Sequence, residues 1–181
     1  MSGSSDWLTE SFEPLIDGIE IDERRRDFIR RRWLEQVVWM ENKAAAAKRR
    51  YFQLRLTTVV GAVMIPALVS LDFANGDLDT AARIATWVVS LLVAVSAAVE
   101  QLFHYGATWR NYRQTVERLK AEGWQYFQLI GDYGVDGSTY DSAYRAFAMR
   151  VEELIRTDVE VYLTEVAAEQ EPAKQPPGPT T

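Results

Sequence analysis

Two long apolar runs interrupt an otherwise polar pattern of residues. They cover residues 56–71 and 84–99, and neither contains a charged side chain. A buried helix of a soluble protein usually keeps a polar stripe at the helical period, whereas these runs are apolar or small on all sides. The pattern therefore favours two transmembrane helices, and the alternative is a pair of core helices in a soluble bundle.

Basic residues beside the runs compensate for their modest length. Sixteen residues of helix measure about 24 Å, somewhat less than the ~30 Å hydrocarbon core of a bilayer. Arg55 and Arg83 have long side chains that can reach the lipid headgroups. The predicted spans therefore extend over about residues 54–74 and 80–99.

The distribution of charge predicts the orientation of the two spans. The connector between them contains Asp72, Asp77 and Asp79 but no Lys or Arg, whereas basic residues precede the first run and follow the second. Because basic residues next to spans are retained in the cytoplasm, we expect both termini to be cytoplasmic and a short acidic turn to lie outside.

Apolar and small residues outside the runs follow a heptad spacing that continues into both spans. In the first arm, residues 22–53, the seam consists of Trp33, Val37, Met40, Ala44, Ala47 and Tyr51. In the second arm, residues 100–130, it consists of Leu102, Tyr105, Trp109, Tyr112, Val116, Leu119, Gly123, Tyr126 and Ile130. The second helix is expected to leave the span without a break, and the two arms should form an antiparallel pair.

The remaining segments complete an all-α integral membrane hairpin with long cytoplasmic extensions. Residues 139–169 carry an apolar stripe and are predicted to form a third cytoplasmic helix along the arms. The acidic residues 1–21 lack a sustained period, so a flexible segment or a short interfacial helix is expected there. The Pro-rich residues 170–181 should be disordered. Residues 22–169 then form the one helical domain.

Small residues and one proline within the spans predict where the helices bend or pack. Pro66 lacks a backbone donor, so a kink is expected there, and Gly61 lies about one turn earlier; together they are a candidate gate. A ladder of small side chains on the second span allows close helix approach, either within one chain or between chains. The ladder consists of Thr86, Ser90, Ala94 and Ala98.

Composition argues against catalysis and cofactor binding. The 181-residue chain has net charge −6, no Cys and one His, and it contains no phosphate-binding glycine loop or catalytic constellation. We therefore expect no enzyme, no cofactor and no metal site. His104 lies four residues after Glu100; an interfacial histidine is the simplest interpretation and a pH sensor is the alternative.

Six arginines between Arg24 and Arg32 form a basic block that the sequence alone leaves open. Nearby Asp and Glu residues partly neutralise the block, which favours a solvated or intersubunit face. Contact with anionic lipid is the second interpretation. Nucleic-acid binding is the third, and the acidity of the whole chain argues against it.

The segment YGATWRNYRQTVERLKAEGWQYFQLIGDYG, residues 105–134, resembles SLATT, a bacterial family of two-transmembrane proteins. The likeness extends over about residues 33–165. Its motif here consists of Trp109, Tyr112-Arg113, Thr115, Glu117 and Leu119-Lys120. The resemblance implies a location in the bacterial cytoplasmic (inner) membrane and a pore-forming effector role in conflict systems. In some members, a separate protein senses a nucleotide second messenger.

Two helices cannot enclose a water path, so conduction requires several copies of the chain. The leading hypothesis is a homo-oligomeric membrane pore or ion channel, a tetramer or pentamer with a preference for cations. Asp72, Asp77 and Asp79 would surround the outer mouth and Glu100 the inner one. The alternative is a non-conducting membrane scaffold or sensor whose cytoplasmic helices dock a regulatory partner protein. Beyond these partners we expect the lipid bilayer and no nucleic acid.

Overall fold

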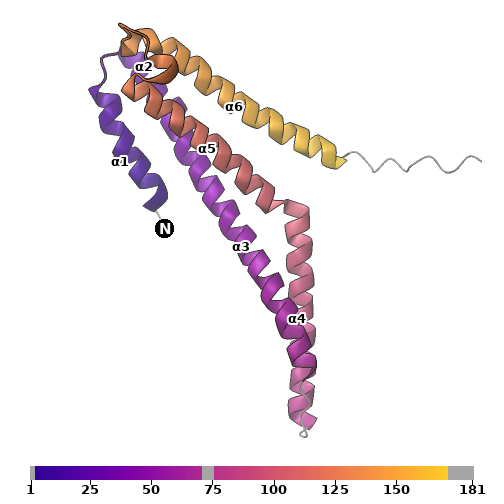
Figure 1. Ribbon diagram of the computed structural model, residues 1–181. Coiled ribbons are helices and arrows are strands. Elements are labelled where there is room, and N and C mark those ends of the chain that lie inside the picture. The colour runs from indigo at the N-terminus through magenta and orange to yellow at the C-terminus, as the bar shows by residue number, and fades with distance from the viewer. Residues whose placement is uncertain (1–2, 71–75, 171–181) are drawn as a thin grey trace, which may run out of the picture. The chain divides into compact units, whose positions relative to one another are not determined.

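The computed structural model describes the backbone of residues 3–70 and 76–170, and the side chains of residues 6–70 and 80–160. This part of the chain is helical and contains no strand (Figure 1), which confirms the predicted all-α class. The elements are α1 (Gly3–Gly18), α2 (Glu23–Phe28), the π-helical η1 (Ile29–Leu34), α3 (Glu35–Val69), α4 (Gly76–Phe103), α5 (Tyr105–Gln128), the 3-10 turn η2 (Gly131–Tyr133) and α6 (Tyr140–Gln170).

The first long helix is continuous, as predicted. α2, η1 and α3 together form 47 helical residues from Glu23 to Val69. Asp22 caps this helix, because its carboxylate accepts hydrogen bonds from the backbone N–H groups of Arg24 and Arg25 at 2.9 and 3.1 Å. The heptad pattern did not indicate the π-helical turn η1, which contains the last three arginines of the basic block.

The chain divides into two compact units, which are described separately. Unit 1 consists of residues up to Met40 and from Gln114 onward, and unit 2 consists of Glu41–Arg113. Unit 1 therefore contains α1, α2, η1, most of α5 and α6. Unit 2 contains most of α3, all of α4 and the start of α5.

An aromatic core built around Trp33 holds unit 1 together. The Trp33 side chain is fully buried, and its indole N–H donates a 3.0 Å hydrogen bond to the backbone carbonyl of Leu119. The rings of Phe12, Phe127 and Phe147 lie 5.0–5.9 Å from the Trp33 ring. Such offset and edge-on contacts stabilise a core beyond the burial of area alone. The predicted antiparallel pairing of the two arms is therefore present in this unit.

Residues 3–18 form helix α1, whereas the sequence left open a flexible segment or a short interfacial helix for residues 1–21. Its Leu8, Phe12 and Ile16 are fully buried and occur at intervals of four residues, which places them on one face of the helix. Phe12 also contacts the ring of Trp124 at 4.7 Å. Three apolar positions around a proline are too short a pattern to predict a buried helix. The aromatic partners of this helix also lie far along the chain, so no local pattern reveals them.

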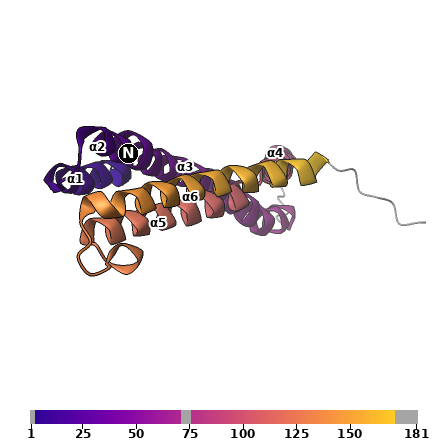
Figure 2. The ribbon, with the colours of Figure 1, turned by 90° about the horizontal axis from the view of Figure 1, so that it is seen from above.

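Helix α6 is the predicted third helix, and it packs on α5 (Figure 2). The Phe147 ring stacks on the ring of Tyr126 at 4.4 Å, and Val151 is also fully buried. The Thr115 hydroxyl donates a 2.8 Å hydrogen bond to the Asp158 carboxylate. The predicted disordered tail, residues 170–181, lies outside the described residues except for Gln170, the last residue of α6.

Unit 2 is a helical hairpin of α3 and α4, which lie side by side in Figure 1. Two helices are long and apolar enough to span a membrane, one ending at Val69 and the other extending from Thr80 to Phe103. Ala74, the predicted limit of the first span, lies outside the described residues. α4 begins at Gly76, four residues before the predicted start at Thr80.

A break at His104 contradicts the prediction of one uninterrupted second helix. α4 ends at Phe103 and α5 begins at Tyr105, and His104 between them has a left-handed φ of 45°. Its carbonyl accepts hydrogen bonds from the backbone N–H groups of Ala107 and Thr108, which start the next helix. The heptad spacing continues across the break, so the sequence pattern concealed it.

Candidate functional site

The hairpin of unit 2 exposes an unusually apolar surface. Only 6% of the apolar stretch of each candidate span is buried. Val63 is 71% exposed and Trp87 is 78% exposed. The other large apolar side chains exposed on the two spans include Leu56, Val59, Val60, Met64, Val69, Ile84, Val88, Leu91, Leu92, Val95, Leu102 and Phe103. A continuous surface of this kind indicates contact with lipid or with other protein.

Four hydroxyl groups in or next to the spans form hydrogen bonds within their own helices. The hydroxyls of Thr57 and Thr58 donate 3.0 Å hydrogen bonds to the carbonyls four residues earlier. Thr86 does the same at 2.9 Å, and Ser70 bonds to the carbonyl three residues earlier at 2.8 Å. Such side chains need no water, so they are compatible with a hydrocarbon environment.

Gly61 is buried at a contact between α3 and α4. A Cβ atom at this position would lie 2.1 Å from Cγ2 of Val93, far inside ordinary contact distance. The structure therefore places this candidate gate residue at a packing contact. Pro66 lies within α3 and is exposed, and its carbonyl accepts a 3.0 Å hydrogen bond from the Ser70 N–H group.

The predicted ladder of small residues on α4 is divided between two faces. Thr86 and Ser90 are partly buried, whereas Ala94 and Ala98 are exposed. Helical spacing explains the division, because the face that packs on α3 contains Val93 and Ser96 instead. Two small residues therefore remain outside the hairpin contact.

The acidic residues predicted to form pore mouths lie at opposite ends of α4. Asp77 and Asp79 lie in its first turn, where their side chains are outside the described residues, and Asp72 lies outside entirely. Glu100 lies in the last turn and is partly buried. The 28 residues of α4 measure about 42 Å, so these groups form no common site within one chain. His104 is exposed at the break between α4 and α5.

Basic and aromatic side chains gather at the end of the hairpin next to His104. The Lys48 ammonium lies 5.7 Å from the centre of the Trp109 ring, and the Arg50 guanidinium lies 5.7 Å from that of Tyr105. The Trp109 ring also stacks on Tyr51 at 6.5 Å. The sequence predicted the aromatic residues of α5 at this level but not their basic partners on α3.

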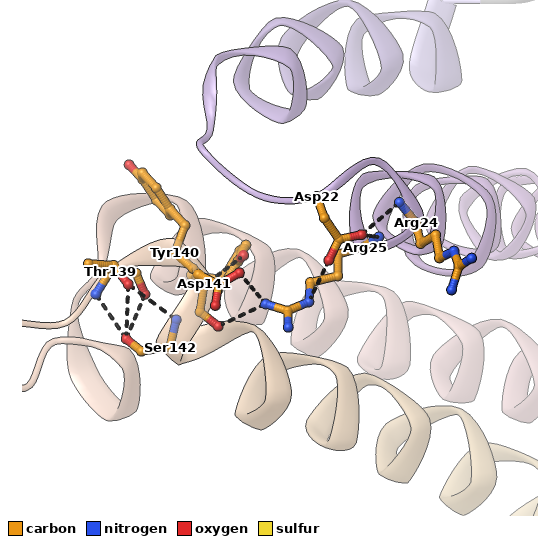
Figure 3. A network of polar contacts seen from close by, with 8 residues as sticks. Asp22, Arg24, Arg25, Thr139, Tyr140, Asp141 and Ser142 are labelled. Carbon is orange, nitrogen blue, oxygen red and sulfur yellow. Dashed lines mark hydrogen bonds and ion pairs between the residues drawn. The ribbon is translucent and has the colours of Figure 1, made fainter.

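Half of the arginines in the basic block of residues 24–32 form internal ion pairs of unit 1. Arg25 pairs with Asp141 at the start of α6 and with Asp22 at 2.9 Å (Figure 3). Arg30 pairs with Asp17 of α1. Arg32 pairs with Glu152 of α6. Three of the six arginines thus connect α2 and η1 to other helices.

The pair between Arg32 and Glu152 has the geometry of a two-pronged ion pair. Nε and Nη2 of Arg32 donate to the two carboxylate oxygens of Glu152 at 2.6 and 2.8 Å. This hydrogen bonding lowers the pKa of Glu152 below its ordinary value. Both side chains remain nearly half exposed, so the pair contributes little stability by itself.

No group of three or more acidic, histidine or cysteine side chains that could hold a metal ion occurs in the described part of the chain. A shallow, open groove of about 1210 Å³ lies on unit 1. Phe28 of α2 and Arg145, Met149 and Arg156 of α6 are among its lining residues.

These features define an all-helical protein with two candidate membrane-spanning helices. The chain belongs to DUF4231, a family of proteins of unknown function, whose model matches residues 35–139 of this sequence. The match includes the whole hairpin and α5 but excludes α1 and all of α6, which complete the core of unit 1. No curated protein matches the chain, and no solved structure matches it.

Proposed function

We propose that this chain is a multi-pass protein of the bacterial cytoplasmic membrane, with both termini in the cytoplasm. The large apolar surface of unit 2 supports insertion, because water would solvate it poorly. The acidic connector and the basic residues at the other end of the hairpin support the orientation. The motif around Trp109 and Tyr112 supports membership of SLATT within the matched region.

In this membrane, several copies form a pore or ion channel. The observation that carries this proposal is the outward position of Ala94 and Ala98, which leaves a close-packing surface on α4 for another copy. A hairpin of two helices cannot enclose water, so about four or five copies are needed. Acidic rings at Asp77, Asp79 and Glu100 would then favour cations.

The apolar spans between these rings keep the pore closed at rest by excluding water. Such a channel suits an effector that a separate protein opens under attack or stress. The regulator is expected to act on the cytoplasmic unit, because only a short connector lies on the other side.

Ion flux from purified full-length protein in liposomes tests conduction. The account predicts cation flux that falls several-fold in Glu100→Gln, because one charge is lost from every subunit at the inner mouth. Glu35→Gln is the matched control, since Glu35 is exposed outside the hairpin. Absence of flux at every voltage and pH, with lysate added as a source of activator, would overturn the channel.

Assembly is tested separately by native mass spectrometry in detergent. Ala94→Leu combined with Ala98→Leu should shift the protein toward monomer, because larger side chains prevent close approach of helices. Val88→Leu adds volume on a different exposed flank of α4 and should leave the mass unchanged. A wild-type monomer would leave no room for a pore.

A membrane scaffold is the second candidate, and the groove along α6 favours it. Met149 is 64% exposed in this groove, and a flexible apolar side chain of this kind is common on docking surfaces. If the scaffold is correct, the protein gives no flux, and Met149→Asp releases a cytoplasmic partner that co-purifies with the wild type.

A further inference from the structure

Four cations of α3 lie close together in the sequence, immediately before the uncharged run of the first span. Lys48, Arg49, Arg50 and Arg55 are all exposed, and none has a carboxylate within ion-pair distance among the described residues. The nearby Arg113, by contrast, binds Glu41 at 2.8 Å. The four cations, here called the basic belt, are therefore charges that the described protein does not neutralise.

The belt forms a narrow band at the end of the apolar surface. Its residues lie within eight positions of one helix, about 10 Å along the axis, and Leu56 begins the uncharged run immediately afterwards. At about 100° per residue, Lys48 and Arg55 lie on one flank of the packing seam and Arg50 on the other. Arg49 lies on the far side, so the charges surround the helix.

Aromatic rings hold two of these cations in place. Lys48 lies over Trp109 and Arg50 over Tyr105, each 5.7 Å from the ring centre. A cation over a ring face is attracted by the π electrons yet keeps its N–H donors for another acceptor. Phe52 and Phe103 at the same level are more than half exposed, as expected for side chains that enter the headgroup region.

We propose that the basic belt binds the phosphate groups of anionic phospholipids in the cytoplasmic leaflet. The charge is complementary, the apolar surface next to it accepts the acyl chains, and the rings lie at the boundary between the two. This inference rests on the proposed membrane location but not on conduction. A positive charge that served orientation alone would not require cations fixed over aromatic rings.

Lipid binding to the full-length protein tests the belt. Native mass spectrometry of protein in detergent counts bound phosphatidylglycerol and phosphatidylcholine during titration of each lipid. The wild type should prefer phosphatidylglycerol. Lys48→Gln combined with Arg50→Gln should weaken its binding about 25-fold, about fivefold for each cation at about 1 kcal/mol per charge.

The matched control removes two charges from unit 1. Arg24→Gln combined with Arg31→Gln changes two exposed arginines that form no ion pair among the described side chains, and it should leave lipid binding unchanged. The exchange Lys48→Arg with Arg50→Lys keeps both charges and should retain the preference.

The outcomes separate this inference from the proposed function. Equal binding of the two lipids by a protein that is integral to the membrane would contradict lipid binding by the basic belt but not the membrane location. Recovery of the protein from cells without detergent would overturn the membrane location itself. Binding of a labelled oligonucleotide that the same substitutions abolish, with lipid binding intact, would assign the belt to nucleic acid instead and contradict the proposal.

Discussion

Substitution of Gly123 by alanine tests the packing of the two arms in unit 1. Cβ of alanine at this position would lie 2.1 Å from Cζ2 and 2.6 Å from Cη2 of Trp33, whereas ordinary carbon contacts are about 3.5–4 Å. Trp33 is fully buried among other rings, so the indole has little space in which to move. One of the two helices must therefore shift by about 1–1.5 Å.

Two opposing effects determine the result. Overpacking of a core costs about 1–3 kcal/mol, and a clash with a large buried ring belongs at the upper end of that range. Alanine in place of glycine inside a helix gains about 1 kcal/mol. The net effect is a loss of about 1–2 kcal/mol in the free energy of unfolding.

Urea unfolding in detergent, followed by near-ultraviolet circular dichroism, measures this loss. Gly18→Ala is the matched control, because Cβ there would meet no atom within 4 Å, and it should be neutral or slightly stabilising. In the Trp33→Phe background, which removes the clashing ring, Gly123→Ala should cost at least about 1 kcal/mol less than in the wild type. A Gly123→Ala protein as stable as the control would refute the close approach of the arms.

Three further predictions concern the hairpin and the response of unit 1 to pH. Gly61→Val should separate the helices of the hairpin, seen as loss of a cross-link between them, because its Cβ would meet Val93 at 2.1 Å. Hydrogen bonding from Arg32 lowers the pKa of Glu152, so this pair stabilises the fold above about pH 4.5 and the contribution is lost as pH falls through the lowered pKa. In a profile of the free energy of unfolding against pH, Glu152→Gln should reduce the fall in stability at acid pH. Burial raises the pKa of Tyr126 well above its usual value of about 10. Stability should therefore fall as pH rises beyond about 10, where unfolded chains ionise first, and Tyr126→Phe should reduce that slope.

Ala62→Val serves as the control for the hairpin substitution. Ala62 is exposed next to Gly61 in the same helix, so the added volume meets no partner within the chain. If both variants lose the cross-link equally, the effect comes from the β-branched side chain rather than from helix contact. For the two pH profiles, unchanged slopes in the variants would contradict the assigned groups.

The long-period features of the fold were predictable from the sequence. A heptad seam repeated over many turns identified the burial of Trp33, Val37 and Met40, and the uncharged runs identified the two candidate spans. These signals are strong because each turn of the helix repeats them.

Features that depend on distant partners were not predictable. Phe12 indicates a core position only when Trp33 and Trp124 are known to lie beside it. The break at His104 leaves the spacing of apolar residues unchanged, so no period reveals it. The role of the arginine block depended on carboxylates far along the chain, such as Asp141 and Glu152, which no local pattern connects to it.

Thiol labelling at Val63 tests the membrane location most directly. The chain contains no cysteine, so Val63→Cys introduces a single thiol near the middle of the first span. This side chain is 71% exposed in the isolated chain, and a soluble protein would therefore react rapidly with a water-borne, membrane-impermeant maleimide. In sealed inverted vesicles the account predicts no reaction at this position and rapid reaction of an Arg31→Cys protein. Equal labelling of the two proteins would contradict insertion of the hairpin in the bilayer.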